Sequence, residues 1–543
     1  MKDGNGNKTT LSYADSPSGG NAAGNSNAYL TTLTLPSTNN VPHVRSFQYN
    51  YTTSEMVQST DENVQPTNYS YIDSLLRLTD VYQPPNAAGT RPHTHYAYSD
   101  GASPTVTTTG PAGIVSVDVS DGLGRKIESE ITSTNPPIIT SYVVYNGVGT
   151  VASAYNPTYC SSPTSNCGES TWGYTTYLYD SLGRRTQQQT QPDKSKRQWC
   201  YENIPSTGQS NCHARLSSVA GIWIDSSDEN GNDWQRTSDG FGRLTALMEP
   251  NGVSSNPPTM ETDYGYNALN NLLSVAQNGA AGGTARNRSF VYNPISQLVQ
   301  AFNPEAGTVC YGVWSGSACG NGYDANGNLT YKTDARGVVT NYGYDALNRL
   351  YAQTYTYAPA GTLSSCYQYD TATNGVGRLA AEWTQAGSCS STPPANYQSL
   401  RTYGAYDAMG RVVTEQQCVA GFCTSASVPS QPTANCPKLS SATGLQYCYD
   451  LAGNLLAYGN GLTTQAAGQY PQQALLFTQT FDAAGRLNSV GSSWSDATHP
   501  QTLFSAPVYT PFNALSNWRL GTQLSTTRTY DVRLRVTGQS SAH

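Results

Sequence analysis

Charged residues are scarce in this sequence of 543 residues: Asp, Glu, Lys and Arg together make up 12%, about half of the ~25% that is usual in soluble domains. The sequence has only 5 Met, and lysine is also rare, which disfavours long helices. Basic residues do not exceed acidic ones, and the net charge of −7 disfavours nucleic acid as a partner. Apolar runs fall well short of the ~18 residues that a membrane helix needs, so we expect no membrane span.

The N-terminal segment has no secretory signal peptide, because residues 1–7 (MKDGNGN) contain no apolar core. These residues have instead the pattern of an internal repeat, and we therefore expect the chain to be a segment of a longer polypeptide. What the sequence has in abundance is 39 Tyr and 50 Gly, together with Thr, Ser and Asn. This composition favours strands joined by tight turns, and the aromatic content disfavours disorder.

A short turn motif recurs along the chain. Two clear copies begin at Tyr323 (YDANGNL) and Tyr344 (YDALNRL), 21 residues apart. Good copies also begin at Asp121 (DGLGRK), Tyr179 (YDSLGRR), Asp239 (DGFGRL), Tyr406 (YDAMGRV), Tyr449 (YDLAGNL) and Phe481 (FDAAGRL). Weaker copies begin at Tyr71, Tyr266, Tyr292, Phe512 and Tyr530, and the copy at Tyr369 carries an insertion.

Each position of the motif suits a hairpin turn. Asp or Asn opens a turn through its side chain, and the Gly or Asn three residues later tolerates positive φ. This pattern predicts a type I turn closed by a G1 bulge, with Ser296 and Ser516 as strained copies. Arg or Asn then begins the return strand, and the Tyr before the turn packs across strands. The expected structural turn residues are Asp121, Gly124, Arg125, Tyr179, Asp180, Gly183, Arg184, Asp239, Gly242, Arg243, Tyr323, Asp324, Gly327, Tyr344, Asp345, Asn348, Arg349, Tyr406, Asp407, Gly410, Arg411, Tyr449, Asp450, Gly453, Asp482, Gly485 and Arg486.

An array of such hairpins predicts an all-β fold. One hairpin of about 21 residues cannot bury its own face, so neighbouring hairpins must join edge to edge. We expect two continuous regions: irregular, degenerate repeats over residues 1–120, and a regular array with cysteine-containing loop insertions over residues 121–543.

The Tyr-Asp-x-x-Gly-Arg copies, above all the stretch from Asp324 to Arg349, resemble the RHS/YD-repeat family. That family includes bacterial polymorphic-toxin carriers, wall-associated proteins, shell components of insecticidal toxin complexes, and teneurins. The resemblance implies a long β-sheet ribbon that spirals into a hollow shell, which in toxin carriers encloses a C-terminal toxin. The sequence lacks the Asp-Pro-x-Gly signature of the self-cleaving core segment. The resemblance therefore implies shell wall without the C-terminal core and toxin.

The 12 cysteines fall as close neighbours, which favours local disulfides over free thiols or metal sites. No C-x-x-C pair is present, and His213 is the only histidine within a few residues of a cysteine. Disulfides in turn imply export, to the medium or the cell surface. The expected pairs are Cys160/Cys167, Cys200/Cys212, Cys310/Cys319, Cys366/Cys389, Cys418/Cys423 and Cys436/Cys448.

Several chemical motifs have a simpler structural interpretation. The runs that begin at Asp3, Asp228 and Asp324 resemble the start of a calcium loop but lack its later glycine and glutamate, so we interpret them as Asn-Gly turns. Gly147-Val-Gly149 and Gly375-Val-Gly377 have the spacing of a dinucleotide fingerprint. No helix is expected after either run, and we therefore expect no cofactor.

His93 and His95, with Asp100 nearby, would share one face if they lay on a strand, as metal ligands can. With only 6 His in the chain, we expect a surface loop there and no metal site. No nucleophile elbow, Walker A or H-E-x-x-H motif is present.

We therefore expect a structural, non-enzymatic scaffold. Its expected partners are the rest of a larger RHS polypeptide or an encapsulated toxin. The alternative is a cell-surface adhesin that binds glycans, because exposed Tyr and Trp faces can bind sugars as well as pack a sheet.

Overall fold

A computed structural model describes the chain except residues 16–25, 87, 205–211, 253–256, 280–284, 420–421, 424–444, 460–474, 495 and 497. The described residues form strands joined by turns and contain no helix. The described part of the chain therefore has no helix that is long and apolar enough to cross a lipid bilayer. This all-β fold confirms the sequence prediction.

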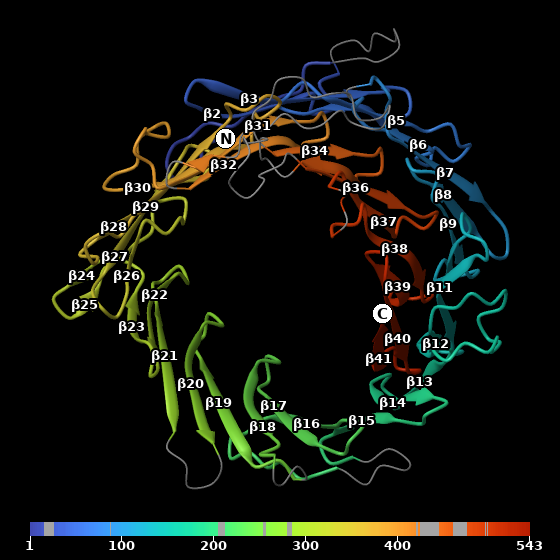
Figure 1. Cartoon of the computed structure of the whole chain (residues 1–543). Helices are drawn as coiled ribbons and strands as arrows, with labels where there is room; N and C mark the ends of the chain where they lie inside the picture. The colour runs from blue at the N-terminus through green and yellow to red at the C-terminus, as the bar shows by residue number, and fades with distance from the viewer. Residues whose placement is uncertain are drawn as a thin grey trace.

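The strands follow one another along the whole chain (Figure 1). The first are β1 (Thr10–Ser12), β2 (Thr32–Thr38), β3 (Val41–Tyr49), β4 (Met56–Thr60), β5 (Pro66–Ser70), β6 (Asp80–Tyr82), β7 (His93–Ser99), β8 (Thr105–Thr109), β9 (Val115–Ser120) and β10 (Lys126–Ile131). Next are β11 (Ile138–Tyr145), β12 (Val151–Tyr155), β13 (Tyr174–Tyr179), β14 (Arg185–Gln191), β15 (Lys196–Tyr201), β16 (Ile222–Ser227), β17 (Asp233–Ser238), β18 (Leu244–Glu249), β19 (Met260–Tyr266) and β20 (Leu272–Gly279). They are followed by β21 (Arg286–Tyr292), β22 (Leu298–Asn303), β23 (Gly307–Cys310), β24 (Trp314–Ser315), β25 (Ala318–Cys319), β26 (Tyr331–Thr333), β27 (Val339–Tyr344), β28 (Leu350–Thr356), β29 (Ser364–Tyr369), β30 (Leu379–Gln385) and β31 (Ser399–Tyr406). The last are β32 (Val412–Val419), β33 (Phe422–Cys423), β34 (Leu445–Tyr449), β35 (Leu455–Gly459), β36 (Leu476–Phe481), β37 (Leu487–Ser492), β38 (Thr502–Tyr509), β39 (Leu515–Leu520), β40 (Leu524–Tyr530) and β41 (Val536–Ala542).

One antiparallel sheet of 39 strands contains all but β24 and β25, which form a small hairpin of their own. Almost every strand pairs with the strands just before and after it in the sequence. The exceptions occur at short insertions, where β23 pairs with β26, and β32 pairs with both β33 and β34. The sheet is therefore a continuous meander, as an array of hairpins requires.

The sheet curves round as an open, spiralling wall (Figure 1). The strands of the first circuit pass from blue through green to yellow, and the later orange and red strands then run alongside the beginning of the chain. Hydrogen bonds join these two circuits between residues that lie more than 300 positions apart, such as Asn63 with Val376 and Asn156 with Val532. The right-handed twist of strands supplies the curvature that a flat meander would lack.

The wall is thin, and most of its side chains are half-buried. Its accessible surface is 28,555 Å², whereas a compact monomer of 58.1 kDa would expose roughly 19,000 Å². The apolar clusters are small: one contains Cys366, Ala381 and Trp383. Many fully buried side chains are polar instead, among them Gln235 and Thr237. Burial alone therefore contributes less here than in a globular core, and local polar contacts carry more of the structure.

His93 and His95 correct one expectation. They lie on β7 and not in a surface loop, because residues 93–99 pair with β6 on one side and β8 on the other. The run HTHYAYS consists largely of Thr, Tyr and His, which suit a half-buried strand. Asp100, the expected neighbour of these histidines, forms an ion pair with Arg77 instead.

Candidate functional site

The turn motif forms a clasp of backbone and side-chain hydrogen bonds, and the copy at Asp180 shows all its parts. The Asp180 N–H donates to the Arg184 carbonyl at 2.9 Å, and the Gly183 N–H donates to the Asp180 carbonyl at 3.0 Å. Asp180 Oδ1 accepts the N–H groups of Leu182 and Arg184, and its Oδ2 accepts Arg184 Nε at 2.7 Å. The pairing register shifts between Leu178 and Tyr179, as a bulge beside the turn requires.

The third residue after the aspartate has positive φ throughout the clear copies. These residues are Gly124 (77°), Gly183 (77°), Gly242 (77°), Gly327 (85°), Gly410 (83°), Gly453 (97°) and Gly485 (76°), with Asn270 (67°) and Asn348 (61°) where asparagine replaces glycine. Where Arg is replaced by Asn, as at Asn328 and Asn454, the amide nitrogen takes the place of Arg Nε and donates to the aspartate. This shared hydrogen bond explains why the motif accepts either residue after the turn.

The degenerate copies keep the geometry with less suitable residues. Ser296 has φ 63°, and Leu534 holds the same position in the last copy with φ 61°. Ser516 corrects the sequence alignment, because it lies within β39 and not at a turn. The turn begins at Thr510, whose N–H donates to the Ala514 carbonyl, and Asn513 takes the positive φ of 65°. Thr510 replaces the aspartate because its hydroxyl also accepts the Ala514 N–H.

An arginine of one hairpin stacks on a tyrosine of the next. Arg184 lies 4.2 Å from the ring centroid of Tyr201, and the Tyr201 hydroxyl donates to the Arg185 carbonyl at 2.9 Å. This contact is not among the contacts expected from the sequence, although the fixed positions of Tyr and Arg in successive copies are a signal for it. The same stacking joins Arg125 with Tyr145, Arg243 with Tyr266, Arg349 with Tyr369, Arg411 with Tyr449, and Arg486 with Tyr509.

The other expected tyrosines also lie directly before a turn. Tyr179 donates to the Val151 carbonyl, Tyr323 to that of Leu298, and Tyr406 to that of Leu379. Tyr344 is the last residue of β27, and the register shifts just before it. Tyr179, Tyr323 and Tyr406 therefore each satisfy a backbone carbonyl beside a turn.

Turns also form the seam between the two circuits. In the turn at Asp61, the Asn63 amide donates to the Val376 carbonyl at 3.0 Å and accepts the Val376 N–H at 2.8 Å. Val376 itself belongs to the turn that Asp370 opens. The turns at Asp3 and Asp324 meet in the same way, because Asn5 donates to Asp324 and Asn326 donates to Asp3.

A buried ionic network reinforces this seam. His43 is fully buried, and its Nδ1 lies 2.7 Å from Glu62 Oε2. Its Nε2 lies 2.7 Å from the Thr38 hydroxyl, which donates to Asp370 across the seam at 2.7 Å. Asp370 also forms an ion pair with Arg349 at 2.6 Å. The network therefore joins β2–β4 of the first circuit to the β28–β30 region of the second.

Hydrogen bonds lower the pKa of several turn aspartates, among them Asp121 and Asp180. The Arg125 side chain is the largest cause that lowers the pKa of Asp121, and the N–H groups of Arg125 and Leu123 add to it. In Asp73, hydrogen bonds from Arg77 lower the pKa to about 2. Burial raises the pKa of Asp180, but the Arg184 hydrogen bonds outweigh it. In the clasp these aspartates accept hydrogen bonds from the backbone and from the arginine of their own turn.

Five disulfides join pairs of cysteines that both lie in the part of the chain that the structure describes. The bonded pairs are Cys160–Cys167, Cys200–Cys212, Cys310–Cys319, Cys366–Cys389 and Cys418–Cys423. These five bonds are the ones that the spacing of the cysteines predicts. Each bond closes a short segment within the meander and so limits the freedom of an insertion.

Cys448 lies within β34, where it pairs with Ala457 of β35. It is buried, with 7% of its surface exposed, in a small apolar cluster with Ala457 and Leu476. The bond expected between Cys448 and Cys436 is not among the five, because Cys436 lies outside the described residues. That sixth pair therefore stays a prediction.

The calcium-loop and dinucleotide alternatives both fall on hairpin turns. Asp3, Asp228 and Asp324 each accept the hydrogen bonds of their own turn. Gly149 has φ 88° in the turn that leads into β12, and Gly377 has φ 83° in the turn that leads into β30. A strand, not a helix, follows each run, so neither site has the helix N-terminus that would hold a phosphate.

An aromatic pocket lies on one face of β15–β17. Trp199 pairs with Ser226, and Ser226 pairs with Trp234, so a serine separates the two indoles. Two strand spacings put the indoles roughly 10 Å apart. Arg197 and Arg236 also line this pocket, which has a volume of 370 Å³.

The comparisons with known proteins agree with this geometry. The model of the RHS repeat matches residues 323–363. A search of curated proteins finds no match. Among solved structures, the crystal structure of TcdB2-TccC3 is 14% identical with a TM-score of 0.65, and the alignment covers 92% of this chain and 26% of that chain. The structure of the Photorhabdus luminescens Tc holotoxin pore is 12% identical with a TM-score of 0.67, and the alignment covers 94% of this chain and 29% of that chain. This chain thus spans less than a third of the chains it resembles, contains an RHS repeat, and has the fold found in these Tc toxin structures.

Proposed function

We propose that the chain is a non-enzymatic structural scaffold, a part of an exported RHS/YD shell that encloses or displays another polypeptide such as a toxin. The observation that carries this proposal is the thin, 39-stranded wall whose turns form the seam between circuits. Such a wall exposes far more surface than a compact protein of its mass, and a wall that curves without filling its interior suits enclosure.

The proposed partners are the rest of a larger RHS polypeptide or an enclosed toxin. The neighbouring structures carry Tc toxin names, and this chain matches less than a third of their length. The five disulfides support a location outside the cytosol, in the medium or at the cell surface.

Small-angle X-ray scattering on the purified chain tests the scaffold. A compact domain of 543 residues has a radius of gyration of roughly 24 Å. We expect a clearly larger radius and a distance distribution typical of a hollow wall. A compact, filled particle would contradict the proposal.

Enclosure needs a second experiment. An unstructured reporter peptide is fused after His543 and digested with a protease, next to the same reporter on a compact carrier protein. We expect slower cleavage on this chain. Equal rates would exclude enclosure of a following segment and leave the displaying role.

The glycan-binding alternative is supported by the pocket between Trp199 and Trp234. Two indoles on one face of a sheet, flanked by arginine and serine side chains, are able to hold a flat sugar face. A glycan array with the native chain and the Trp199→Ala and Trp234→Ala variants tests it, with Trp518→Ala as an aromatic control away from the pocket. Hits that only the first two variants lose would favour the adhesin; an array without hits would exclude it for the glycans present.

A further inference from the structure

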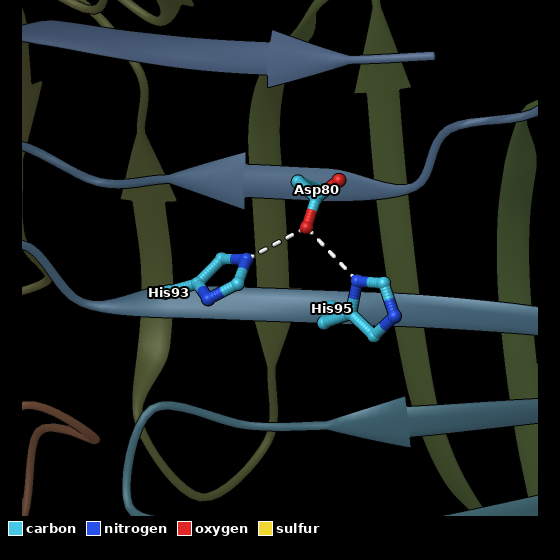
Figure 2. Close-up of side chains that lie close together, drawn as sticks. All are labelled: Asp80, His93 and His95. Carbon is cyan, nitrogen blue, oxygen red and sulfur yellow. Dashed lines mark hydrogen bonds and ion pairs between the residues drawn. The ribbon is translucent and has the colours of Figure 1, made fainter. Parts of the chain in front are cut away.

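Three potential metal ligands converge on two neighbouring strands (Figure 2). Asp80 begins β6, and His93 and His95 lie on β7. Asp80 Oδ1 lies 2.8 Å from His93 Nε2 and 2.9 Å from His95 Nδ1. One ligand atom from each of the three residues lies within 4.8 Å of the others.

Strand register explains why these residues meet. In the antiparallel pair β6–β7, Asp80 is the partner of His95, and Tyr82 is the partner of His93. Residues two apart on a strand share a face, so the carboxylate and both imidazoles point to the same side of the sheet. The sequence alone does not place Asp80 beside the histidines, because that position depends on the pairing of β6 with β7.

The neighbouring residues hold the three side chains in place but leave the two imidazoles accessible to solvent. Asp80 is buried, with 7% of its surface exposed, whereas the His93 and His95 side chains are 39% and 42% exposed. The Tyr82 ring stacks on the His93 ring at 4.2 Å and 3°. Burial raises the pKa of Asp80, but the hydrogen bonds from His95 and His93 outweigh it and keep the pKa below its usual value. The anchor is thus a buried carboxylate, and the exposed imidazoles leave room for a further ligand.

We propose that Asp80, His93 and His95 bind one divalent transition-metal ion, of which zinc best suits two imidazoles and a carboxylate. Zinc–ligand distances of about 2.0–2.1 Å place the ligand atoms of a tetrahedral site about 3.3 Å apart. The carboxylate oxygen and the imidazole nitrogens therefore need to separate by only about half an ångström, which side-chain rotation supplies. Three protein ligands leave one coordination position for water or for a group of another molecule.

The bound ion would join the two strands of one hairpin. β6 is only three residues long, and hydrogen bonds between Gln83 and Pro92 and between Asn86 and Thr90 continue its pairing with β7. A metal bridge between the strands would hold this border in the way that the disulfides hold other insertions.

Isothermal titration of the full chain with zinc chloride alone, under oxidising conditions, tests the proposal. The described cysteines are disulfide-bonded, so thiolates do not compete there. We expect one zinc ion per chain. The His93→Gln and His95→Gln variants should each bind at least ~10-fold more weakly. His499→Gln is the matched control, since His499 also contacts a carboxylate, that of Asp496, but has no second histidine beside it.

Cobalt(II) gives an independent readout, because its visible absorption reports nitrogen and oxygen ligands. The bands should appear with the native chain and His499→Gln and be absent with the His93→Gln/His95→Gln double variant. Native circular dichroism of each variant shows that it folds. Zinc binding that the double variant retains unchanged, or no stoichiometric binding by the folded native chain, would overturn the proposal.

Discussion

The turn glycines owe their role to backbone conformation and not to crowding. At Gly183 φ is +77°, and a Cβ added there would meet nothing within 4 Å. The cost of a side chain at this residue is therefore that of a left-handed backbone alone. Asn348 shows that asparagine tolerates the same position.

Gly183→Ala should destabilise its hairpin by about 1 kcal/mol, and Gly183→Asn should cost less. Hydrogen exchange of β13 and β14 measures this local loss, which a global melting curve of so long an array would dilute. Gly147→Ala is the control, because Gly147 also has open space around it but no positive φ. Equal effects of alanine at both positions would contradict the backbone argument.

Some of the turn aspartates, Asp121 and Asp239 among them, make the fold sensitive to acid. Hydrogen bonds from Arg125 lower the pKa of Asp121, and those from Arg243 lower the pKa of Asp239. A carboxyl group with a lower pKa in the folded state stabilises it above the unfolded pKa of about 4, and this contribution is lost as the pH falls.

We expect the native chain to lose stability progressively from pH 4 to about pH 2, the pKa that Arg77 gives to Asp73. Chemical denaturation at successive pH values, followed by circular dichroism, measures the slope. The Asp73→Asn variant should have a lower free energy of unfolding than the native chain at neutral pH. Its free energy of unfolding should also fall less steeply as the pH is lowered. A native chain equally stable at pH 5 and pH 2 would show that the clasps contribute nothing.

At the scale of the hairpin, arginine is the element that joins one unit to the next. Arg411 donates through Nε to Asp407 of its own turn at 2.6 Å and through a terminal nitrogen to the Asp450 carbonyl of the next turn at 3.0 Å. Its guanidinium also lies 4.6 Å from the Tyr449 ring centroid. A lysine cannot make these three contacts at once.

Arg411→Lys should therefore expose β34 and β35 to faster hydrogen exchange, although the charge is kept. Tyr449→Phe should have a smaller effect, about 1 kcal/mol, because it removes one hydrogen bond to the Val412 carbonyl. The double variant should lose less than the sum of the two, since the residues contact each other. Strict additivity would argue against the interlock.

The hairpins were predictable from the sequence because their chemistry is local. One turn is made by Asp180, Gly183 and Arg184, which lie within five residues. Each of these residue types indicates its role in the turn. The alignment at Ser516 failed because Thr510 and Asn513 make the same turn with unexpected residues. The seam could not be predicted, since Asn63 and Val376 are 313 positions apart and the sequence around each residue does not indicate which residue it contacts.

At the scale of the whole molecule, the seam decides whether the wall is a spiral or an open strip. The division between residues 1–120 and 121–543 stays a prediction, and the sheet itself runs across it from β9 to β10. Asn63 makes two hydrogen bonds to the Val376 backbone, and the Thr38–Asp370 contact lies near them.

Asn63→Ala combined with Thr38→Val should loosen the seam, at about 1 kcal/mol for each lost hydrogen bond. Small-angle scattering should show a larger radius of gyration, while circular dichroism keeps its β signal. The matched control is Asn68→Ala, which removes a hydrogen bond to Gln58 within one circuit. An unchanged radius in the double variant would mean that strand curvature alone holds the circuits together.

The contact between Asn63 and Val376 also fixes how many hairpins one lap contains. Elsewhere a meander of neighbour-to-neighbour strands accepts the gain or loss of one unit at little cost, since just two borders change. If one hairpin were gained or lost between Asn63 and Val376, every later turn would be displaced relative to the turn that it contacts in the first circuit. The number of hairpins between these two residues therefore sets the circumference of the wall. Insertions that keep this number unchanged belong in the segments between turns, where the disulfides lie.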